Sequence, residues 1–162
     1  HRFSAFTASV LQLRPESKGE LKLRSSNPMD HPRIFPNYLA TKTDCDTLVN
    51  GIKITRGICG YDPVRSLITD EFSPGQAING DNDAAILEWA RNTSTTIYHP
   101  SGTCKMGKDP MAVVDPRLRV HGVGRLRVAD ASIMPTITSG NTNAPAIMIG
   151  EKVSDMLMED AG

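Results

Sequence analysis

The spacing of apolar residues along the chain predicts three helices, over residues 43–61, 81–94 and 144–160. In each segment the apolar residues recur every three or four positions, so that they would share one face of an α-helix. The expected apolar faces consist of Cys45, Leu48, Val49 and Ile52 in the first helix, Ile86, Trp89 and Ala90 in the second, and Ile149, Val153, Met156 and Leu157 in the third.

Polar residues and glycine mark the expected ends of the first two helices. Thr43 with Asp46 resembles a capping box at the start of the first helix, and Gly60 can end that helix. The second helix has Asp81 or Asp83 as its expected cap.

Alternation of apolar and polar residues predicts strands in two regions. Residues 10–25 are typical of two strands joined by a turn at 17–19, and residues 117–128 are typical of a hairpin around Gly122 and Gly124. The proline-rich residues 25–39 are expected to form an extended crossing segment. Strands and helices without a strand–helix–strand rhythm favour the α+β class.

Composition excludes several classes of protein. The chain is 39% hydrophobic and 22% charged with a formal net charge of zero, so we expect no nucleic-acid partner. No apolar run reaches the length of about 18 residues that a transmembrane helix needs. The first residues show neither an initiator methionine nor a signal peptide, and we therefore expect a piece of a longer protein.

The three cysteines do not predict a metal site. The spacings of Cys45, Cys59 and Cys104 match no zinc or redox pair, and their odd number fits a reducing compartment. Cys104 follows His99 by five residues, which leaves a nucleophile or a metal ligand open beside the favoured interpretation of a small packing residue.

Two segments combine reactive side chains with the composition of loops. His99 lies in "YHPSGTCKMG", and Asn141 and Asn143 lie in "SGNTNAP", directly before the third helix. A histidine is more often structural than catalytic, and asparagines before a helix are usually caps. These residues by themselves leave both interpretations open.

The strings "YHPSGTCKMG", "DPRLRVHGVGRLRVADASIMP" and "SGNTNAPAIMIGEK" resemble, in order and spacing, the C-terminal blocks of the glucose–methanol–choline (GMC) family of FAD-dependent oxidoreductases. The choline-dehydrogenase-like members are the most similar in these blocks. "QLRPESKGELKLRS" and "PRIFPNYL" also resemble the substrate-binding part of the family. The resemblance implies an antiparallel sheet with flanking helices over residues 1–95, in the substrate-binding domain. It implies that residues 96–162 carry the active-site loop and the segments that complete the FAD domain.

The resemblance also implies roles for single residues. His99 matches the histidine that accepts the hydroxyl proton of the alcohol, and Asn141 matches its partner in the active site. The positions that match cofactor-binding residues are Ile97, Asp130, Ala131, Thr142 and Asn143. The implied reaction is hydride transfer from a choline-like alcohol to FAD.

General chemistry agrees with these roles. Imidazole, with a pKa of about 6.5, can take a proton near neutral pH, and an asparagine amide can bind the same oxygen without titrating. A helix that begins near Ala144 and points at the flavin would stabilise negative charge there by roughly 0.3–2 kcal/mol. Pro145 suits the first turn of that helix, where a missing N–H is tolerated.

One expected motif is absent from the sequence. FAD binding in the family depends on a G-x-G-x-x-G loop, and "GVGRLR" at Gly122 lacks the third glycine. We therefore expect a missing N-terminal FAD-binding portion, in the same or a separate chain, and weak or no FAD binding by this chain alone. The alternatives are a catalytically inactive substrate-domain fragment and a GMC-type lyase.

The sequence leaves several properties of the protein open. We expect a cytoplasmic location, with peripheral attachment at the inner membrane as the alternative if electrons pass to a respiratory carrier. The identity of the alcohol, the choice between oxygen and a quinone-type acceptor, membrane association and the formation of a homo-oligomer are not decided by the sequence.

Overall fold

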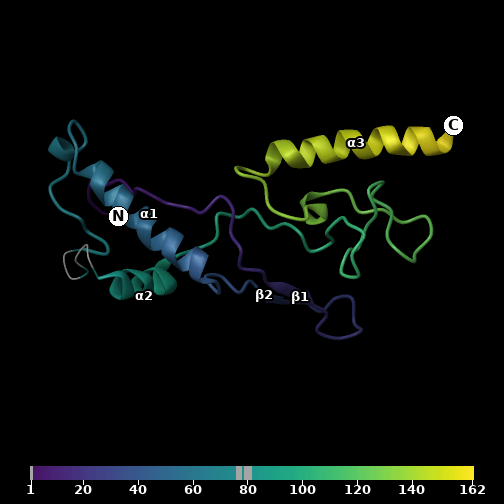
Figure 1. Ribbon diagram of the computed structural model, residues 1–162, viewed down its shortest axis with the longest axis horizontal. Coiled ribbons are helices and arrows are strands. Elements are labelled where there is room, and N and C mark those ends of the chain that lie inside the picture. Colours follow the sequence, from purple (N-terminus) through teal and green to yellow (C-terminus); the bar gives the residue numbers. More distant parts are fainter. Residues whose placement is uncertain (1, 76–77, 79–81) are drawn as a thin grey trace. The chain divides into compact units, whose positions relative to one another are not determined.

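The computed structural model describes residues 2–75, 78 and 82–162. Their elements, in chain order, are β1 (Glu20–Lys22), β2 (Arg33–Phe35), α1 (Lys42–Cys59), η1 (Arg65–Leu67), α2 (Asp83–Thr93), η2 (Ala131–Ile133) and α3 (Asn143–Ala161) (Figure 1). An antiparallel pair of strands with separate helices confirms the predicted α+β class. The chain divides into two compact units, one of His1–Gly19 with Pro36–Thr95 and one of Glu20–Phe35 with Thr96–Gly162.

The start of α1 differs from the prediction by two residues. The cap is Thr41, whose Oγ1 accepts a hydrogen bond from the Asp44 N–H at 3.2 Å, and Thr43 lies inside the helix. The T-x-x-D pattern occurs at both positions, and only Thr41 has the extended backbone of a cap. Gly60 is the C-cap, as predicted.

The cap of α2 is Asn82, whose Oδ1 accepts a hydrogen bond from the Ala85 N–H at 3.0 Å. The predicted cap at Asp83 is therefore wrong, and Asp81 lies outside the described residues. Asp83 occupies the first turn of α2, where a carboxylate interacts favourably with the helix dipole.

The two helices α1 and α2 contact each other and bury the predicted apolar faces. Cys45, Val49, Ile86 and Ala90 are at most 8% exposed. Trp89, which also belongs to the predicted face of α2, is only half-buried. Gly51 permits the preceding chain to approach α1 closely, because a Cβ there would lie 2.4 Å from Val10 Cγ2.

The strand β1 pairs with β2 in an antiparallel register that sets Leu21 opposite Ile34. The predicted pairing of this strand with residues 10–13 is wrong, and part of the expected crossing segment supplies its partner. The reason lies at Ser17, in the expected turn. Its N–H donates to Asp44 Oδ2 at 2.8 Å and its Oγ accepts from the Ala40 N–H at 3.0 Å, so that the turn residues are held at the start of α1.

The hairpin predicted over residues 117–128 forms, but as isolated bridges instead of regular strands. Arg119 pairs with Arg127, and the Val120 N–H donates to the Leu126 carbonyl at 2.9 Å. Leu118 has a φ of 64°, a left-handed conformation that interrupts a regular strand.

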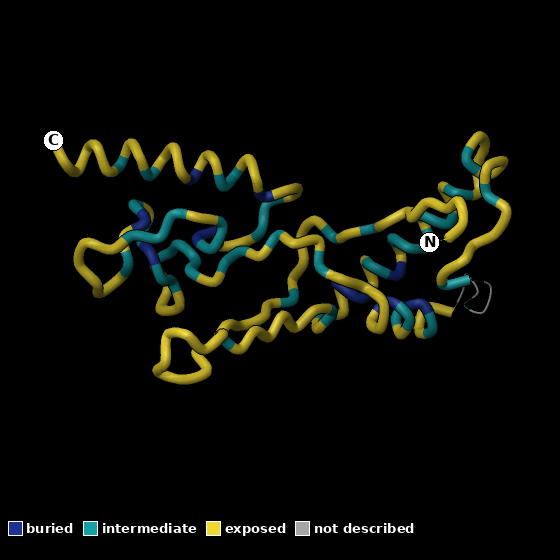
Figure 2. The backbone as a smooth tube through the Cα atoms, turned by 180° about the vertical axis from the view of Figure 1, so that it is seen from behind, coloured by how far each residue is buried: buried dark blue, intermediate teal, exposed yellow. Residues whose placement is uncertain are grey.

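The helix α3 lies beside η2 and buries Ile149 in a core with Val114, Leu118, Ile133 and Met134 (Figure 1). Val153 and Met156 pack against this core, as the predicted apolar face requires. Leu157 is 51% exposed, so the predicted face does not extend to it. Figure 2 shows that most positions of α3 are exposed.

Candidate active site

The loop that follows His99 is bonded along its backbone to η2. The N–H groups of Gly102, Cys104 and Met106 donate to the carbonyls of residues 131, 132 and 133, at 3.3, 2.9 and 2.7 Å. Gly102 has a φ of 83°, and a Cβ there would lie 3.2 Å from the Met134 carbonyl oxygen. Glycine at this position therefore permits the two segments to run side by side.

The residues predicted to lie along a cofactor in this segment have defined backbone roles. Asp130 is the N-cap of η2, and its Oδ1 accepts a hydrogen bond from the Ser132 N–H at 2.7 Å. Asp130 is exposed. Ala131 is half-buried, and its carbonyl accepts the hydrogen bond from the Gly102 N–H. The turn is therefore fixed at both ends beside the His99 loop.

The side chain of His99 contacts the start of α3. Its Nδ1 lies 2.9 Å from Oγ1 of Thr142, the N-cap residue of the helix. His99 is half-buried and Thr142 is 9% exposed. Asn141 and Asn143 flank Thr142 and are both exposed. The structure therefore brings His99 to the segment that contains both asparagines.

The backbone turns sharply just before His99. Tyr98 has a φ of 63°, a left-handed conformation that is uncommon for a large aromatic residue and that recurs at functional sites. The Tyr98 N–H donates to Thr96 Oγ1 at 3.0 Å. The side chains of Ile97 and Tyr98 are 49% and 77% exposed, whereas His99 turns inward.

The N-terminus of α3 offers backbone donors to an outside acceptor. The Thr142 side chain makes no cap hydrogen bond to the helix. Pro145 has no N–H, and the Ala146 N–H donates to the Thr142 carbonyl at 2.9 Å. In the first turn, the N–H groups of Asn143 and Ala144 therefore have no acceptor within a regular helix.

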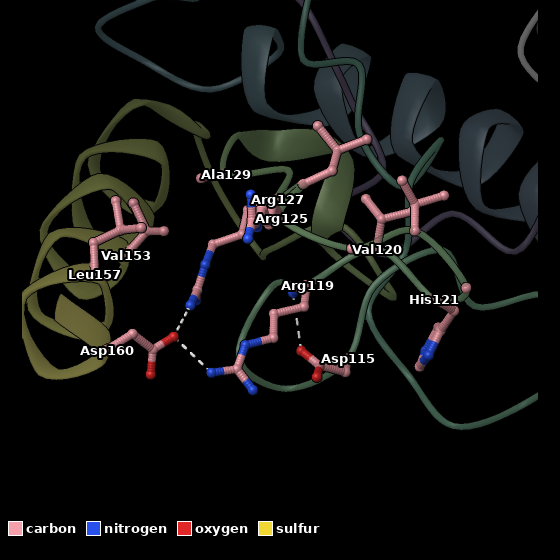
Figure 3. Close-up of a pocket in the computed structure, with 14 residues that line it drawn as sticks. Asp115, Arg119, Val120, His121, Arg125, Arg127, Ala129, Val153, Leu157 and Asp160 are labelled. Atoms are coloured by element: carbon pink, nitrogen blue, oxygen red, sulfur yellow. Dashed lines mark hydrogen bonds and ion pairs between the residues drawn. The ribbon is translucent and has the colours of Figure 1, made fainter.

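A pocket near the other end of α3 contains none of the predicted site residues (Figure 3). Figure 3 shows Asp160 facing Arg119 and Arg127, and both guanidinium groups form ion pairs with it. His121 is one of the residues that line this pocket. It is exposed, but its Nε2 lies 3.1 Å from the Gly107 carbonyl oxygen.

Within residues 2–75, 78 and 82–162, no group of three or more His, Cys, Asp or Glu side chains is placed to hold a metal ion. The helices of the same ranges include none long and apolar enough to cross a bilayer. Cys45, Cys59 and Cys104 carry free thiols, and Cys45 is buried.

Residues 15–150 match the model of the family described as GMC oxidoreductase. The chain belongs to the GMC oxidoreductase family. This membership confirms the resemblance seen in the three sequence blocks. The matched residues include both the His99 loop and the start of α3.

Relatives in the GMC family include flavin-dependent and alcohol-oxidising enzymes. The chain is 46% identical over 153 residues to an alcohol dehydrogenase [acceptor] of Pseudomonas putida, covering 94% of this chain and 27% of that protein. It is 48% identical over 155 residues to the mitochondrial choline dehydrogenase of Homo sapiens, covering 94% and 26%. A formate oxidase of Aspergillus oryzae, studied for modification of its FAD, superposes with a TM-score of 0.84 at 31% identity, over 91% of this chain and 26% of that one.

The chain therefore spans about a quarter of the length of these GMC relatives. Within that span, sequence reasoning assigned Thr142 to the cofactor and did not anticipate its contact with His99. Pro145 is the feature of the sequence that could have predicted this contact. A proline at the third helical position has no N–H for a threonine cap to bind, so the threonine hydroxyl is left for another partner.

Proposed function

We propose that the full-length GMC oxidoreductase containing this chain oxidises a choline-like alcohol, with His99 accepting the hydroxyl proton. The observation that carries the proposal is the 2.9 Å contact between His99 Nδ1 and Thr142 Oγ1. Thr142 directly follows Asn141 in the chain, so the contact supports a shared site for His99 and Asn141. The alcohol and choline dehydrogenases among the relatives support the reaction class.

The residues at this end of α3 fit a flavin. The Asn143 and Ala144 N–H groups and the positive end of the helix dipole suit an acceptor that becomes negatively charged. The exposed Asn143 side chain adds a further donor beside them. When bound, FAD supplies the acceptor for the hydride that leaves the alcohol carbon.

The two side chains proposed for catalysis have different tasks. With Nδ1 engaged by Thr142, His99 has Nε2 available for the hydroxyl proton. The Asn141 amide hydrogen-bonds the same oxygen and holds the alcohol in place without titrating. Proton removal from the oxygen makes departure of the hydride from the adjacent carbon favourable.

The remaining predicted positions are proposed to bind the cofactor. Asp130 and Ala131 would lie along the ribityl and pyrophosphate groups, since η2 is fixed beside the His99 loop by three backbone bonds. Ile97, which is 49% exposed, offers an apolar surface two residues before His99. The adenine end of FAD and much of the substrate pocket belong to the portion of the enzyme outside this chain.

The experiment that tests the proposal is His99→Ala in the full-length, FAD-loaded enzyme. We expect anaerobic stopped-flow reduction of the flavin by alcohol to slow by roughly 10²–10⁴-fold, as for loss of a general base. The FAD content, measured from the visible absorbance, should stay near that of the wild type.

His121→Ala is the matched control, because His121 is bonded to Gly107 in the same unit but lies in the pocket that contains no predicted site residue. Reduction rates that are unchanged in His99→Ala would refute the proposed role. A loss of FAD in parallel with the rate would make His99 a structural residue instead.

A further inference from the structure

We propose that Thr142 is a positioning residue that fixes the tautomer of His99, and that Pro145 releases Thr142 for this task. The inference rests on the proposed role of His99 as proton acceptor. It adds to that role the side chain that decides which ring nitrogen takes the proton.

The chain contains two threonine caps that behave differently. Thr41 caps α1 in the usual way, with an extended backbone and a bond from the N–H of the third helical residue, Asp44, at 3.2 Å. Thr142 holds the same position in α3, but the third helical residue there is Pro145, which has no N–H. Its backbone, at φ −87° and ψ 0°, also differs from the φ −98° and ψ 152° of Thr41.

The released hydroxyl is directed to His99. Thr142 is 9% exposed, and most hydroxyls at that depth are hydrogen-bonded. His99 Nδ1 supplies this partner at 2.9 Å, across 43 positions of the chain. The proline therefore turns a helix cap into a support for the imidazole.

The chemistry of the proton step sets the direction of this hydrogen bond. A hydroxyl can donate or accept, but an imidazole that has taken up a proton carries N–H at both nitrogens, so Thr142 must then accept. If Thr142 also accepts from Nδ1–H in the neutral ring, Nε2 holds the lone pair that receives the proton. The same bond then persists through the step, and the ring need neither rotate nor exchange its tautomer.

The test uses the full-length, FAD-loaded protein and two measurements. The tautomer of His99 is observed directly by NMR of protein labelled with ¹⁵N-histidine, with His99→Gln used to assign its ring nitrogens. The rate of flavin reduction by alcohol is measured by anaerobic stopped flow. We expect the wild type to hold its proton on Nδ1, with Nε2 unprotonated.

Three variants examine the contact. Thr142→Val removes the hydroxyl at nearly constant shape, and we expect loss of the Nδ1–H preference and a reduction rate lower by about tenfold, typical of one lost hydrogen bond. Thr142→Ser keeps the hydroxyl and should retain both the tautomer and the rate. Pro145→Ala restores an N–H that competes for Thr142, and should give intermediate values of both.

Thr138→Val is the matched control. Thr138 lies four residues earlier, and its Oγ1 is buried without a hydrogen-bond partner among the described residues. The same chemical change at this position should leave the tautomer of His99 and the reduction rate as in the wild type.

The proposal is overturned if Thr142→Val leaves the tautomer unchanged, or if Thr138→Val alters it equally. It is also overturned if the wild-type ring holds its proton on Nε2. Failure of the proposed function gives a different result, namely a His99→Ala enzyme that reduces flavin at the wild-type rate. In that case a tautomer change in Thr142→Val would still assign the positioning contact to Thr142.

Discussion

Asp44 is a single carboxylate that joins segments distant in the chain. It lies in the first turn of α1, is 2% exposed, and accepts the N–H groups of Glu16 and Ser17 at 2.9 and 2.8 Å. Burial acts to raise the pKa of Asp44, but the hydrogen bonds from Glu16, Ser17 and Gln12 together outweigh burial and lower the pKa to about 2. The ionised form of Asp44 is therefore the one that holds residues 16 and 17 on α1.

This arrangement predicts a loss of stability in acid. Because the pKa of Asp44 in the folded protein lies below the unfolded value of 3.8, its contribution is complete above that pH. The contribution falls as the pH drops toward 2 and amounts to roughly 2 kcal/mol. We expect the wild type to have a larger free energy of unfolding than Asp44→Asn, measured in urea from pH 6 to pH 2.5. The difference between the two proteins should become smaller below pH 4.

Asp46→Asn serves as the control for Asp44→Asn, because Asp46 is exposed and pairs with the exposed Lys42 in the same helix. The free energy of unfolding of Asp46→Asn should differ little from that of the wild type at every pH. A margin between wild type and Asp44→Asn that stays constant down to pH 2.5 would contradict the assignment.

At the scale of single residues, the roles expected for His99 and Asn141 came from the family resemblance, and they remain predictions. Imidazole and carboxamide groups suit proton transfer from an alcohol and hydrogen bonding to it. The contact of Thr142 was not predictable in this way. Threonine before a helix is ordinarily a cap, and only the combination with Pro145 and a histidine distant in the chain gives it another partner.

At the scale of secondary structure, helices were predicted more closely than strands. Helical periodicity is local, and the buried faces of α1 and α2 follow it. Strand pairing depends on contacts between distant residues. Ser17 shows the consequence, because its bonds to Asp44 and Ala40 remove the turn that would have paired β1 with the preceding residues.

The helix α3 is attached near its C-terminus by a cluster of arginines from the hairpin. Arg119 and Arg127 pair with Asp160 (Figure 3). Arg117 also pairs with Asp160, and its Nη2 lies 3.3 Å from the Met156 carbonyl oxygen. The hydrogen bond from Arg119 is the largest influence on Asp160 and lowers the pKa of its carboxyl. The helix is therefore fixed near both ends, by Thr142 at the site and by Asp160 here.

We expect Asp160→Asn to lower the melting temperature by a few degrees, because three guanidinium groups lose a shared carboxylate. Added salt should reduce the difference from the wild type, since exposed ion pairs are screened. The difference should also diminish as the pH falls below 3.8, since the lowered pKa of Asp160 keeps its ionised form stabilising above that pH. Thermal melts at two ionic strengths and several pH values provide the measurement.

Asp155→Asn is the control for Asp160→Asn, since Asp155 is an exposed residue of the same helix that pairs with Lys152 at 3.4 Å. Equal effects of the two substitutions would show that the arginine cluster does not stabilise α3. If the difference in melting temperature between Asp160→Asn and the wild type does not change with salt, the effect comes from packing of the Asp160 side chain and not from its ion pairs.

At the scale of the whole molecule, the chain supplies one side of the proposed site. It spans 26–27% of the GMC relatives and contains the His99 loop, η2 and the open start of α3. The G-x-G-x-x-G loop that holds the pyrophosphate of a dinucleotide is absent from the sequence. The donors available here suit the flavin end of FAD, through Asn143, Ala144 and the segment at Asp130.

This division predicts that the 162-residue chain alone does not retain FAD. The adenine and pyrophosphate groups provide much of the surface and charge by which a protein holds a dinucleotide, and we expect most of their contacts to lie outside the chain. The purified chain should be colourless after gel filtration with added FAD, whereas the full-length enzyme should keep flavin absorbance in near-stoichiometric amount. Circular dichroism of the same sample, with the helical signal of α1, α2 and α3, controls for unfolding. A folded, yellow chain with stoichiometric flavin would show that the dinucleotide contacts lie within these residues and would contradict the division.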